Sequence, residues 1–203
     1  MSTTPTRAIT RVATVVAVVI GLSTGCSTSQ GTQGTQGVDQ GYVAGDGSLV
    51  RLAVDDREDP IEASGQTLDG GQVDIADWRG DIVVLNTWFA ACGPCRLEAP
   101  DLVEISAEYA PDGVQFLGIN TRDGAAQAIA FEEQYAVPYP SVLDRDGDVV
   151  LALRGALPPT ATPTTLVLDR QGRVAARILG QIDPAVLRGV LDQALEEAPV
   201  PAL

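Results

Sequence analysis

The stretch Trp88-Phe89-Ala90-Ala91-Cys92-Gly93-Pro94-Cys95 constrains this chain most, because it places two cysteines directly after the apolar run Ile82–Leu85. The run predicts a strand buried on both faces, and the residues after Cys95 predict a helix. Cysteines with this spacing at a helix start are close enough to form a disulfide ring. The unpaired backbone N–H groups there favour the thiolate of the first cysteine. The pattern predicts a redox dithiol, with half of a zinc site or an inert structural disulfide as alternatives.

Composition narrows the available chemistry. The chain has 203 residues, 45% of them hydrophobic, which suits one domain of ordinary size with appendages. Its formal net charge of -14 disfavours binding to nucleic acid or anionic lipid headgroups. The sequence has neither His nor Lys, which excludes His-based triads, Lys Schiff bases, c-type haem attachment and the common His-containing metal sites. We therefore expect no metal and no cofactor other than the redox-active cysteine pair itself.

Residues 1–25 have the order of a signal peptide. Arg7 and Arg11 precede the apolar run Val12–Leu22, which small residues and Cys26 follow. This run is shorter than the roughly 20 residues of a membrane-spanning helix and fits a signal-peptide core of about 7–15. A small residue before a lone cysteine is typical of a bacterial lipobox, so we predict cleavage before Cys26 and lipidation of its thiol. Cleavage by the ordinary signal peptidase and an uncleaved anchor are the alternatives, and both still export the domain.

Residues 26–47 are predicted to form a flexible tether beginning at Cys26. They are rich in Ser, Thr, Gln and Gly and have almost nothing to bury. A coil of about 20 such residues has a root-mean-square span of roughly 25 Å. Residues 48–203 are then the folded domain.

Strands and helices alternate along the folded domain. The expected elements, in chain order, are a hairpin (61–63 and 73–75), a strand (82–85), a helix (to 109), a strand (114–119), a helix (123–135), a strand (141–143), a hairpin (164–169 and 174–178) and a last helix after 183. A long loop is expected at 155–163, and residues 48–59 receive no element. The strand-helix-strand order implies a parallel pair with a right-handed crossover. Together these elements predict an α/β fold with a mixed central sheet flanked by helices.

Two helices carry specific signals. After Cys95, four apolar residues recur at near-helical spacing: Leu97, Leu102, Ile105 and Tyr109. Pro100 is expected to kink this helix. In the last helix, Asp183 is the expected N-cap and Pro184 the first helical residue.

These motifs resemble the TlpA/ResA-like thiol-disulfide oxidoreductases, which are exported, often lipid-anchored proteins of the thioredoxin fold. The resemblance extends from about Ile61 to Leu195. The residues that carry it are Asp69-Gly70, Arg79-Gly80, Val83 to Trp88, Cys92 to Arg96, Glu98, Pro100 and Thr162 to Thr165. It implies a thioredoxin-like fold with an N-terminal β-hairpin extension and a helical insert after Asn120.

The resemblance also implies roles for the dithiol residues. Cys92 would be the exposed nucleophile that attacks a disulfide, and Cys95 the buried thiol that resolves the mixed disulfide. Gly93 and Pro94 would support the pair. Pro163 matches the cis-proline of the family, which lies across from the dithiol, with an ordinary trans-proline as the alternative. The backbone of Thr162, next to it in the sequence, would pair with an incoming extended peptide.

Three further residues lie where relatives tune the active site. Glu98 would assist proton transfer at Cys95, with a solvated helix carboxylate as the alternative. Asn86 stands where cytoplasmic thioredoxins carry a buried Asp, so the second thiol lacks its usual carboxylate base from the strand. Trp88 is expected to pack under the motif, and Ala91 replaces the Trp that commonly precedes the first cysteine.

The resemblance implies an exported dithiol reductase anchored to the outer face of the bacterial membrane. Its partners would be disulfide-bearing exported proteins, which in relatives include apocytochrome c, and a membrane thiol electron donor. The main alternative is an oxidant that introduces disulfides into exported proteins. A peroxidase of this fold needs Thr three residues before its reactive cysteine, where this chain has Phe89, and a copper-delivery protein needs a wider cysteine spacing and a His. A disulfide that acts only as a structural staple is a further alternative.

Overall fold

The computed structural model describes residues 42–43, 48–157 and 161–197. The predicted signal peptide, Cys26 and all but two residues of the predicted tether lie outside these ranges. Helices in the described ranges are all too short or too polar to cross a membrane.

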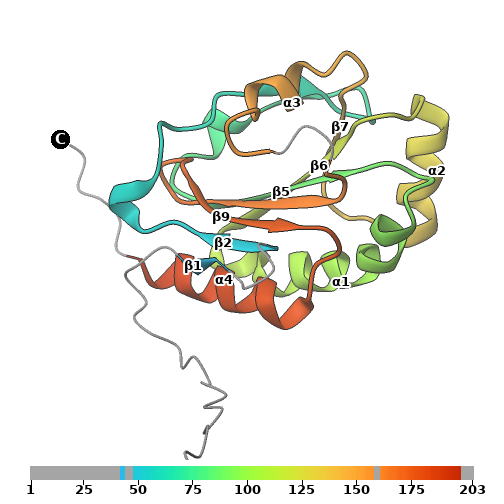
Figure 1. Cartoon of the computed structure of the whole chain (residues 1–203). Coiled ribbons are helices and arrows are strands. Elements are labelled where there is room, and N and C mark those ends of the chain that lie inside the picture. Colours follow the sequence, from blue (N-terminus) through green and yellow to red (C-terminus); the bar gives the residue numbers. More distant parts are fainter. Residues whose placement is uncertain (1–41, 44–47, 158–160, 198–203) are drawn as a thin grey trace, which may run out of the picture. The chain divides into compact units, whose positions relative to one another are not determined.

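A mixed sheet forms the centre of the folded domain (Figure 1). Within the described residues, seven strands join it in the order β1-β2-β9-β8-β5-β6-β7. Their bounds are Tyr42–Val43 (β1), Leu49–Arg51 (β2), Ile82–Trp88 (β5), Val114–Asn120 (β6), Ser141–Leu143 (β7), Thr164–Leu168 (β8) and Val174–Leu179 (β9). Strands β5, β6 and β7 run parallel, whereas β8 pairs antiparallel with both β5 and β9. The predicted parallel pair and the predicted C-terminal hairpin are both confirmed.

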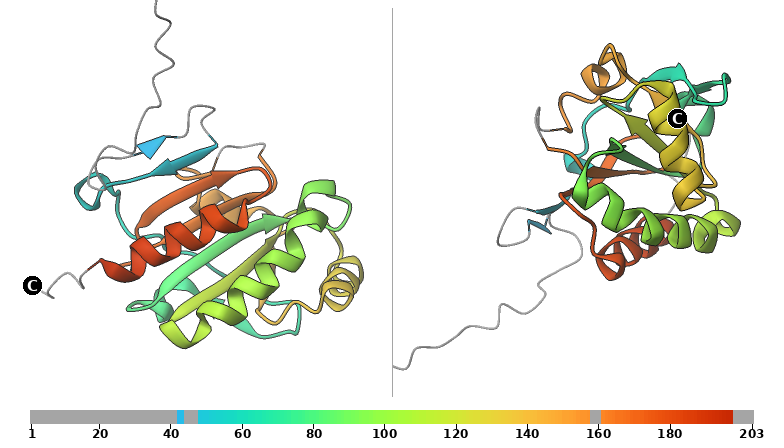
Figure 2. Two further views of the ribbon diagram at one scale, coloured as in Figure 1. Left: turned by 90° about the horizontal axis from the view of Figure 1, so that it is seen from below. Right: turned by 90° about the vertical axis from the view of Figure 1, so that its right-hand side faces the viewer.

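Helices and a separate hairpin cover the sheet. Their bounds are Ser64–Gln66 (β3), Gln72–Asp74 (β4), Gly93–Tyr109 (α1), Ala125–Tyr135 (α2), Asp148–Ala152 (α3) and Pro184–Glu196 (α4), with short 3-10 turns at Val54–Asp56 (η1), Ile75–Trp78 (η2) and Ala110–Asp112 (η3). Helices α1 and α4 lie side by side under one face, and α3 lies over the other (Figures 1 and 2). The N-terminal hairpin is β3-β4, and its first strand begins at Ser64, later than the predicted 61–63.

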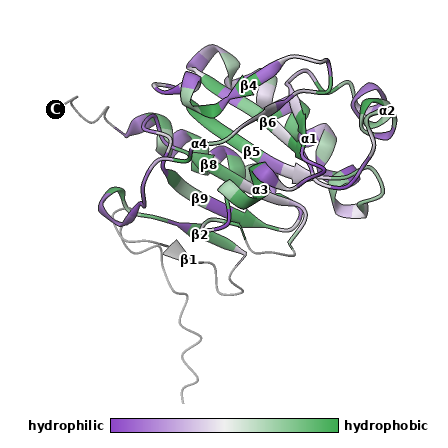
Figure 3. Cartoon of the chain, turned by 90° about the horizontal axis from the view of Figure 1, so that it is seen from above, coloured by the Kyte–Doolittle hydropathy of each residue, from purple (hydrophilic) through white to green (hydrophobic). Residues whose placement is uncertain are grey.

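Alternation along β5 sends its side chains to two separate cores. Ile82 and Val84 pack with α1 and α4, while Val83 and Leu85 pack with η2 and α3. Every residue of β5 is buried, as the continuous apolar run predicts. Figure 3 shows the consequence, with the hydrophobic central strands enclosed by more polar elements.

Strand β1 lies within residues 26–47, which were predicted to be a flexible tether, and it pairs with β2. Two further short elements escaped the sequence prediction. Strand β2 lies within the segment to which no element was assigned, and it forms by pairing with the edge of β9. Helix α3 follows Asp144, whose carboxylate accepts the backbone N–H groups of Val149 and Val150 at 3.0 and 2.9 Å. Elements of three to five residues carry too little periodicity to be predicted, because tertiary contacts stabilise them.

Helix α1 corrects one expectation about its buried stripe. Leu102, Ile105 and Tyr109 are buried as predicted, but Leu97 is 65% exposed. The stripe instead continues through Glu98 and Cys95, at the i, i+3 and i+4 spacing of one helix face. Pro100 lies inside the helix as expected.

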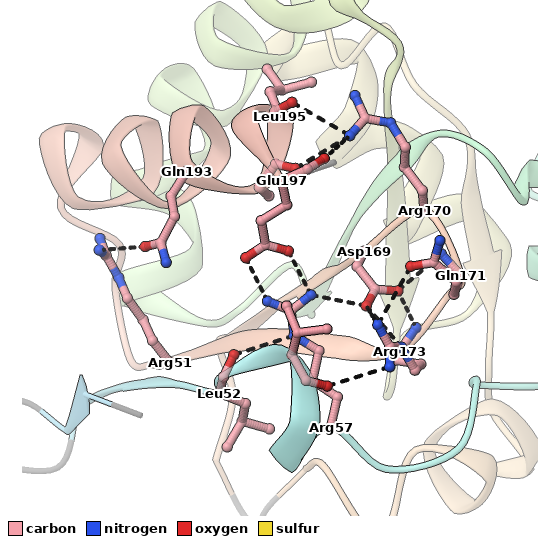
Figure 4. A network of polar contacts seen from close by, with 12 residues as sticks. Arg51, Leu52, Arg57, Asp169, Arg170, Gln171, Arg173, Gln193, Leu195 and Glu197 are labelled. Atoms are coloured by element: carbon pink, nitrogen blue, oxygen red, sulfur yellow. Dashed lines mark hydrogen bonds and ion pairs between the residues drawn. The ribbon is translucent and has the colours of Figure 1, made fainter. Parts of the chain in front are cut away.

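A buried ion network anchors the segment before the hairpin (Figure 4). The Arg57 side chain, 2% exposed, contacts Asp169 Oδ2 at 2.9 Å and Glu197 Oε1 at 2.6 Å. Asp169 follows β8 and also binds Arg173, while Glu197 follows α4. One guanidinium therefore ties together three segments that are far apart in the sequence.

Candidate active site

The two cysteines of the dithiol lie at the start of α1. Cys92 is the N-cap residue, and its Sγ accepts the backbone N–H of Cys95 at 3.1 Å. Cys92 and Cys95 form a disulfide with a Cα–Cα distance of 5.3 Å. Pro94 lies in the first turn, where its missing N–H costs nothing. The predicted strand-dithiol-helix arrangement is therefore present.

The expected exposure of Cys92 is wrong for this disulfide form. Cys92 is 4% exposed and Cys95 2%, so the two differ little in burial. Trp88, Ala99 and Phe131 belong to the same small apolar cluster as both cysteines. The other residues of the loop, Ala91, Gly93 and Pro94, are exposed. A partner would therefore reach Cys92 past these small residues.

Glu98 is a fully buried carboxyl, and the alternative of a solvated helix carboxylate is wrong. It is 0% exposed, and two donors hold it. Asn86 Nδ2 donates to Glu98 Oε1 at 2.9 Å, and the backbone N–H of Ile182 donates to Oε2 at 2.9 Å. Asn86 Nδ2 also donates to Oγ1 of Thr165 at 3.1 Å. Thr165 is the residue of the neighbouring strand β8 that pairs with Asn86. The carboxyl absent from β5 is thus supplied by α1.

Sequence patterns account for this meeting. Asn86 lies two residues after Val84 and therefore faces α1, because alternate residues of a strand share a face. Glu98 stands three residues after Cys95 and four before Leu102, within the buried stripe of α1. Strand alternation and helix spacing together could have decided between a solvated and a buried Glu98.

Burial dominates the proton affinity of Glu98. Loss of hydration raises the pKa of Glu98 to about 7, and the negative charge of Asp101 adds to this effect. The hydrogen bonds from Ile182 and Asn86 oppose it, because they stabilise the charged form. A carboxyl with a pKa near neutrality can both accept and release a proton under ordinary conditions.

Pro163 reaches the same edge of the sheet as the dithiol. The Thr162–Pro163 peptide bond is cis, as the resemblance implied. Thr164, the first residue of β8, pairs with Thr87 near the end of β5, and its N–H donates to Thr87 Oγ1 at 2.9 Å. Because β5 and β8 are antiparallel, the start of β8 and the end of β5 lie together.

Trp88 packs under the motif as predicted. It is 4% exposed and stacks on Phe131 of α2 with ring centroids 4.4 Å apart. Helix α2, the helical insert, therefore packs against Trp88 below the dithiol.

A small cavity, about one water molecule in volume, lies beside Cys95. Its volume is about 10 Å³, and Asn86, Trp88, Tyr139 and Ser141 are among the residues that line it. Burial and the charges of Glu98 and Glu132 raise the pKa of Tyr139. Sequence reasoning missed Tyr139 and Ser141, since nothing in a Pro-flanked loop indicates a contact with a distant cysteine.

In the part of the chain that the structure describes, no group of three or more Cys, Asp or Glu side chains could hold a metal ion.

The fold and the dithiol define a class, that of thioredoxin-like proteins with the site of thiol-disulfide oxidoreductases. Known structures agree with this. The chain is similar to a secreted thiol-disulfide isomerase from Corynebacterium glutamicum, with a TM-score of 0.70 and 32% identity over 77% of this chain and 97% of the other. It is also similar to a DsbF homologue from Corynebacterium diphtheriae, with a TM-score of 0.66 and 34% identity over 74% and 96% of the two chains.

Within this class, the chain belongs to the AhpC/TSA family, whose model matches residues 58–177. Among curated proteins, it is 34% identical over 94 residues to the thiol-disulfide oxidoreductase ResA of Geobacillus thermodenitrificans, covering 46% of this chain and 54% of ResA. ResA of Bacillus subtilis is 30% identical over 81 residues, covering 40% and 45%. The chain thus spans about half the length of the curated relatives it matches. These matches confirm the resemblance inferred from the motifs.

Proposed function

We propose that this protein is an exported thiol-disulfide oxidoreductase that reduces disulfides in partner proteins. The observation that carries the proposal is the pairing of the Cys92–Cys95 dithiol at a helix start with the buried carboxyl of Glu98, three residues further along the same helix. The names of the relatives support the oxidoreductase class. The secreted relative from Corynebacterium glutamicum supports export.

The proposed reaction moves two electrons from the dithiol to the partner. The Cys92 thiolate attacks a partner disulfide, which forms a mixed disulfide and releases one partner thiol. The Cys95 thiolate then attacks Cys92 Sγ, releases the second partner thiol and leaves the Cys92–Cys95 disulfide. The α1 amide groups stabilise the Cys92 thiolate, and Glu98 accepts the proton that Cys95 gives up. The backbone of Thr162, beside Pro163, pairs with the partner segment.

The proposal includes a location and a donor. Residues 1–25 act as signal peptide, Cys26 carries the lipid, and residues 26–47 hold the domain on the outer face of the cell membrane. Because outward-facing compartments are oxidising, a membrane thiol donor must return the dithiol to its reduced form. Exported proteins with disulfides are the partners, and oxidised apocytochrome c is one candidate.

Trapping tests the proposed reaction. In a Cys95→Ser variant the mixed disulfide at Cys92 cannot resolve, so partners should accumulate as covalent complexes that mass spectrometry identifies. The matched Cys92→Ser variant should trap far fewer partners. Equal trapping by both variants, or none by either, would contradict the assigned roles.

An oxidant role is the second candidate, because Cys92 and Cys95 form the disulfide that an oxidant would donate to a partner. A redox titration of the dithiol separates the two directions. Reductants of this fold lie near thioredoxin, at about -270 mV, whereas strong oxidants lie near -120 mV. A potential in the oxidant range would overturn the reductase proposal.

A further inference from the structure

Two exposed arginines lie over the loop that leads into the dithiol. Arg96, one helical turn after Cys92, folds back so that its Nη1 donates to the carbonyl oxygen of Ala90 at 3.3 Å. Arg122, from the segment between β6 and α2, places its guanidinium carbon 4.5 Å from the ring centre of Phe89. Both cations are therefore positioned on residues 89–90, two to three residues before the reactive Cys92.

Within the described part of the chain, these two charges have no acidic partner. Among the described residues, neither arginine has a carboxylate within ion-pair distance, although acids outnumber arginines about two to one in the whole chain. The acid beside Arg122 is Asp123, which is turned inward. Its Oδ2 accepts the N–H of Ala90 at 2.6 Å and the side-chain amide of Asn120 at 2.8 Å. The negative charge at this edge is thus buried, and the positive charges face solvent.

The contacts that fix the arginines leave their hydrogen-bonding edges available. The guanidinium carbon of Arg122 lies over the Phe89 ring, and the Arg122 side chain donates no hydrogen bond within the described ranges. Arg96 lies 5.8 Å from the ring centre of Tyr135 and uses one donor on Ala90. A guanidinium with free N–H groups can present two of them side by side, in the geometry that matches a carboxylate.

The other exposed residues from 91 to 97 carry no charge. Ala91, Gly93 and Pro94 are exposed and neutral, and Leu97 adds an apolar side chain that is 65% exposed. We propose that Arg96 and Arg122 form a cationic rim that selects partner segments with carboxylates beside their disulfide. This substrate class rests on the proposed reductase function. It is the class that a protein of net charge -14 would repel without a local positive site.

The test uses three synthetic substrates. Each is a disulfide-linked homodimer of a blocked pentapeptide with a central cysteine, flanked on both sides by Glu, Gln or Lys. The second-order rate constant with which each peptide oxidises the reduced protein is measured in a single turnover. It is divided by the rate constant of dithiothreitol with the same peptide, which removes the intrinsic effect of the flanks on the disulfide. The selectivity is the Glu-to-Gln ratio of these normalised values.

The double variant Arg96→Gln/Arg122→Gln should lower this selectivity about fourfold, or about twofold for each exposed arginine. Arg188→Gln is a control that removes one positive charge. Its partner Glu104 lies nine residues beyond Cys95, about 13 Å along α1, so the selectivity should stay unchanged. The single variants Arg96→Gln and Arg122→Gln match this control in net charge.

Each outcome decides between structural and recognition roles. A merely structural role for the arginines would slow all three peptides equally and leave the selectivity as it was, which would overturn the inference. An equal loss of selectivity in Arg188→Gln and in the single rim variants would also overturn it, because net charge would then explain the effect. Failure of the wild-type protein to reduce any of the peptides would refute the proposed function itself.

Discussion

The substitution Glu98→Gln should change how stability depends on pH. Burial raises the pKa of Glu98 from 4.5 to about 7, so the folded state binds a proton more tightly than the unfolded chain. This contribution to stability is fully present below the unfolded pKa and is lost as pH rises through the folded pKa. At 1.36 kcal/mol per pKa unit, the wild-type protein should lose about 2.5 kcal/mol from this group between about pH 5 and pH 8.

The glutamine variant should lack this loss, because it stays neutral. The introduced side chain can keep the bond from the Ile182 N–H through its carbonyl oxygen. Its amide can donate to Asn86 if the Asn86 amide turns over. The variant therefore mimics the protonated form of Glu98. The difference in unfolding free energy, variant minus wild type, should become more positive by about 2.5 kcal/mol from about pH 5 to pH 8.

Urea unfolding of the oxidised proteins, followed by tryptophan fluorescence at several pH values, measures this difference. Glu104→Gln is the matched control, because Glu104 lies on the same helix but its side chain is 72% exposed. The unfolding free energy of that control should change with pH in the same way as that of the wild type. Parallel curves for Glu98→Gln as well would refute the assignment of a neutral-range pKa to Glu98.

Three substitutions test the surrounding fold by the same unfolding measurement. Asp183→Ala removes the N-cap of α4, whose carboxylate accepts two backbone N–H groups, and should cost about 1 kcal/mol; no change would mean that solvent caps the helix equally well. Arg57→Gln strips a buried cation from its two carboxylates and should cost about 3 kcal/mol at neutral pH. A cost below that of an exposed ion pair would contradict its burial. Gly118→Ala should cost about 2 kcal/mol through overpacking, because a Cβ there collides with the Ser141 hydroxyl and lies 2.7 Å from Trp88 Nε1. An unchanged midpoint would show that this contact has room.

The sequence predicted the long elements and the dithiol because their signals are local. A strand with a continuous apolar run needs cover on both of its faces, so the run predicted that β5 lies in the centre of the sheet. The Asp183-Pro184 pair fixed the start of α4, since its cap and first turn need nothing beyond neighbouring residues. The position of the dithiol at a helix start followed in the same way.

Features decided by distant contacts were missed or left open. The exposure of Leu97 depends on where α1 turns relative to the sheet, which apolar spacing alone does not determine. Strand β2 forms because its backbone pairs with β9, which is distant in the sequence. The buried cluster that includes Cys92 also contains Phe131, which belongs to the insert between β6 and β7.

Proton affinity at the site is accordingly a property of the tertiary fold and not of the Cys-Gly-Pro-Cys motif. The donors that lower the pKa of Glu98 come from residues 12 and 84 positions away, Asn86 in β5 and Ile182 before α4. Burial between α1 and the sheet outweighs both donors and sets the pKa near 7. Because the donors belong to separate segments, a substitution that displaces either one would raise the pKa of Glu98 further without touching a cysteine. Chains that share the dithiol sequence can therefore differ in how readily the second thiol loses its proton.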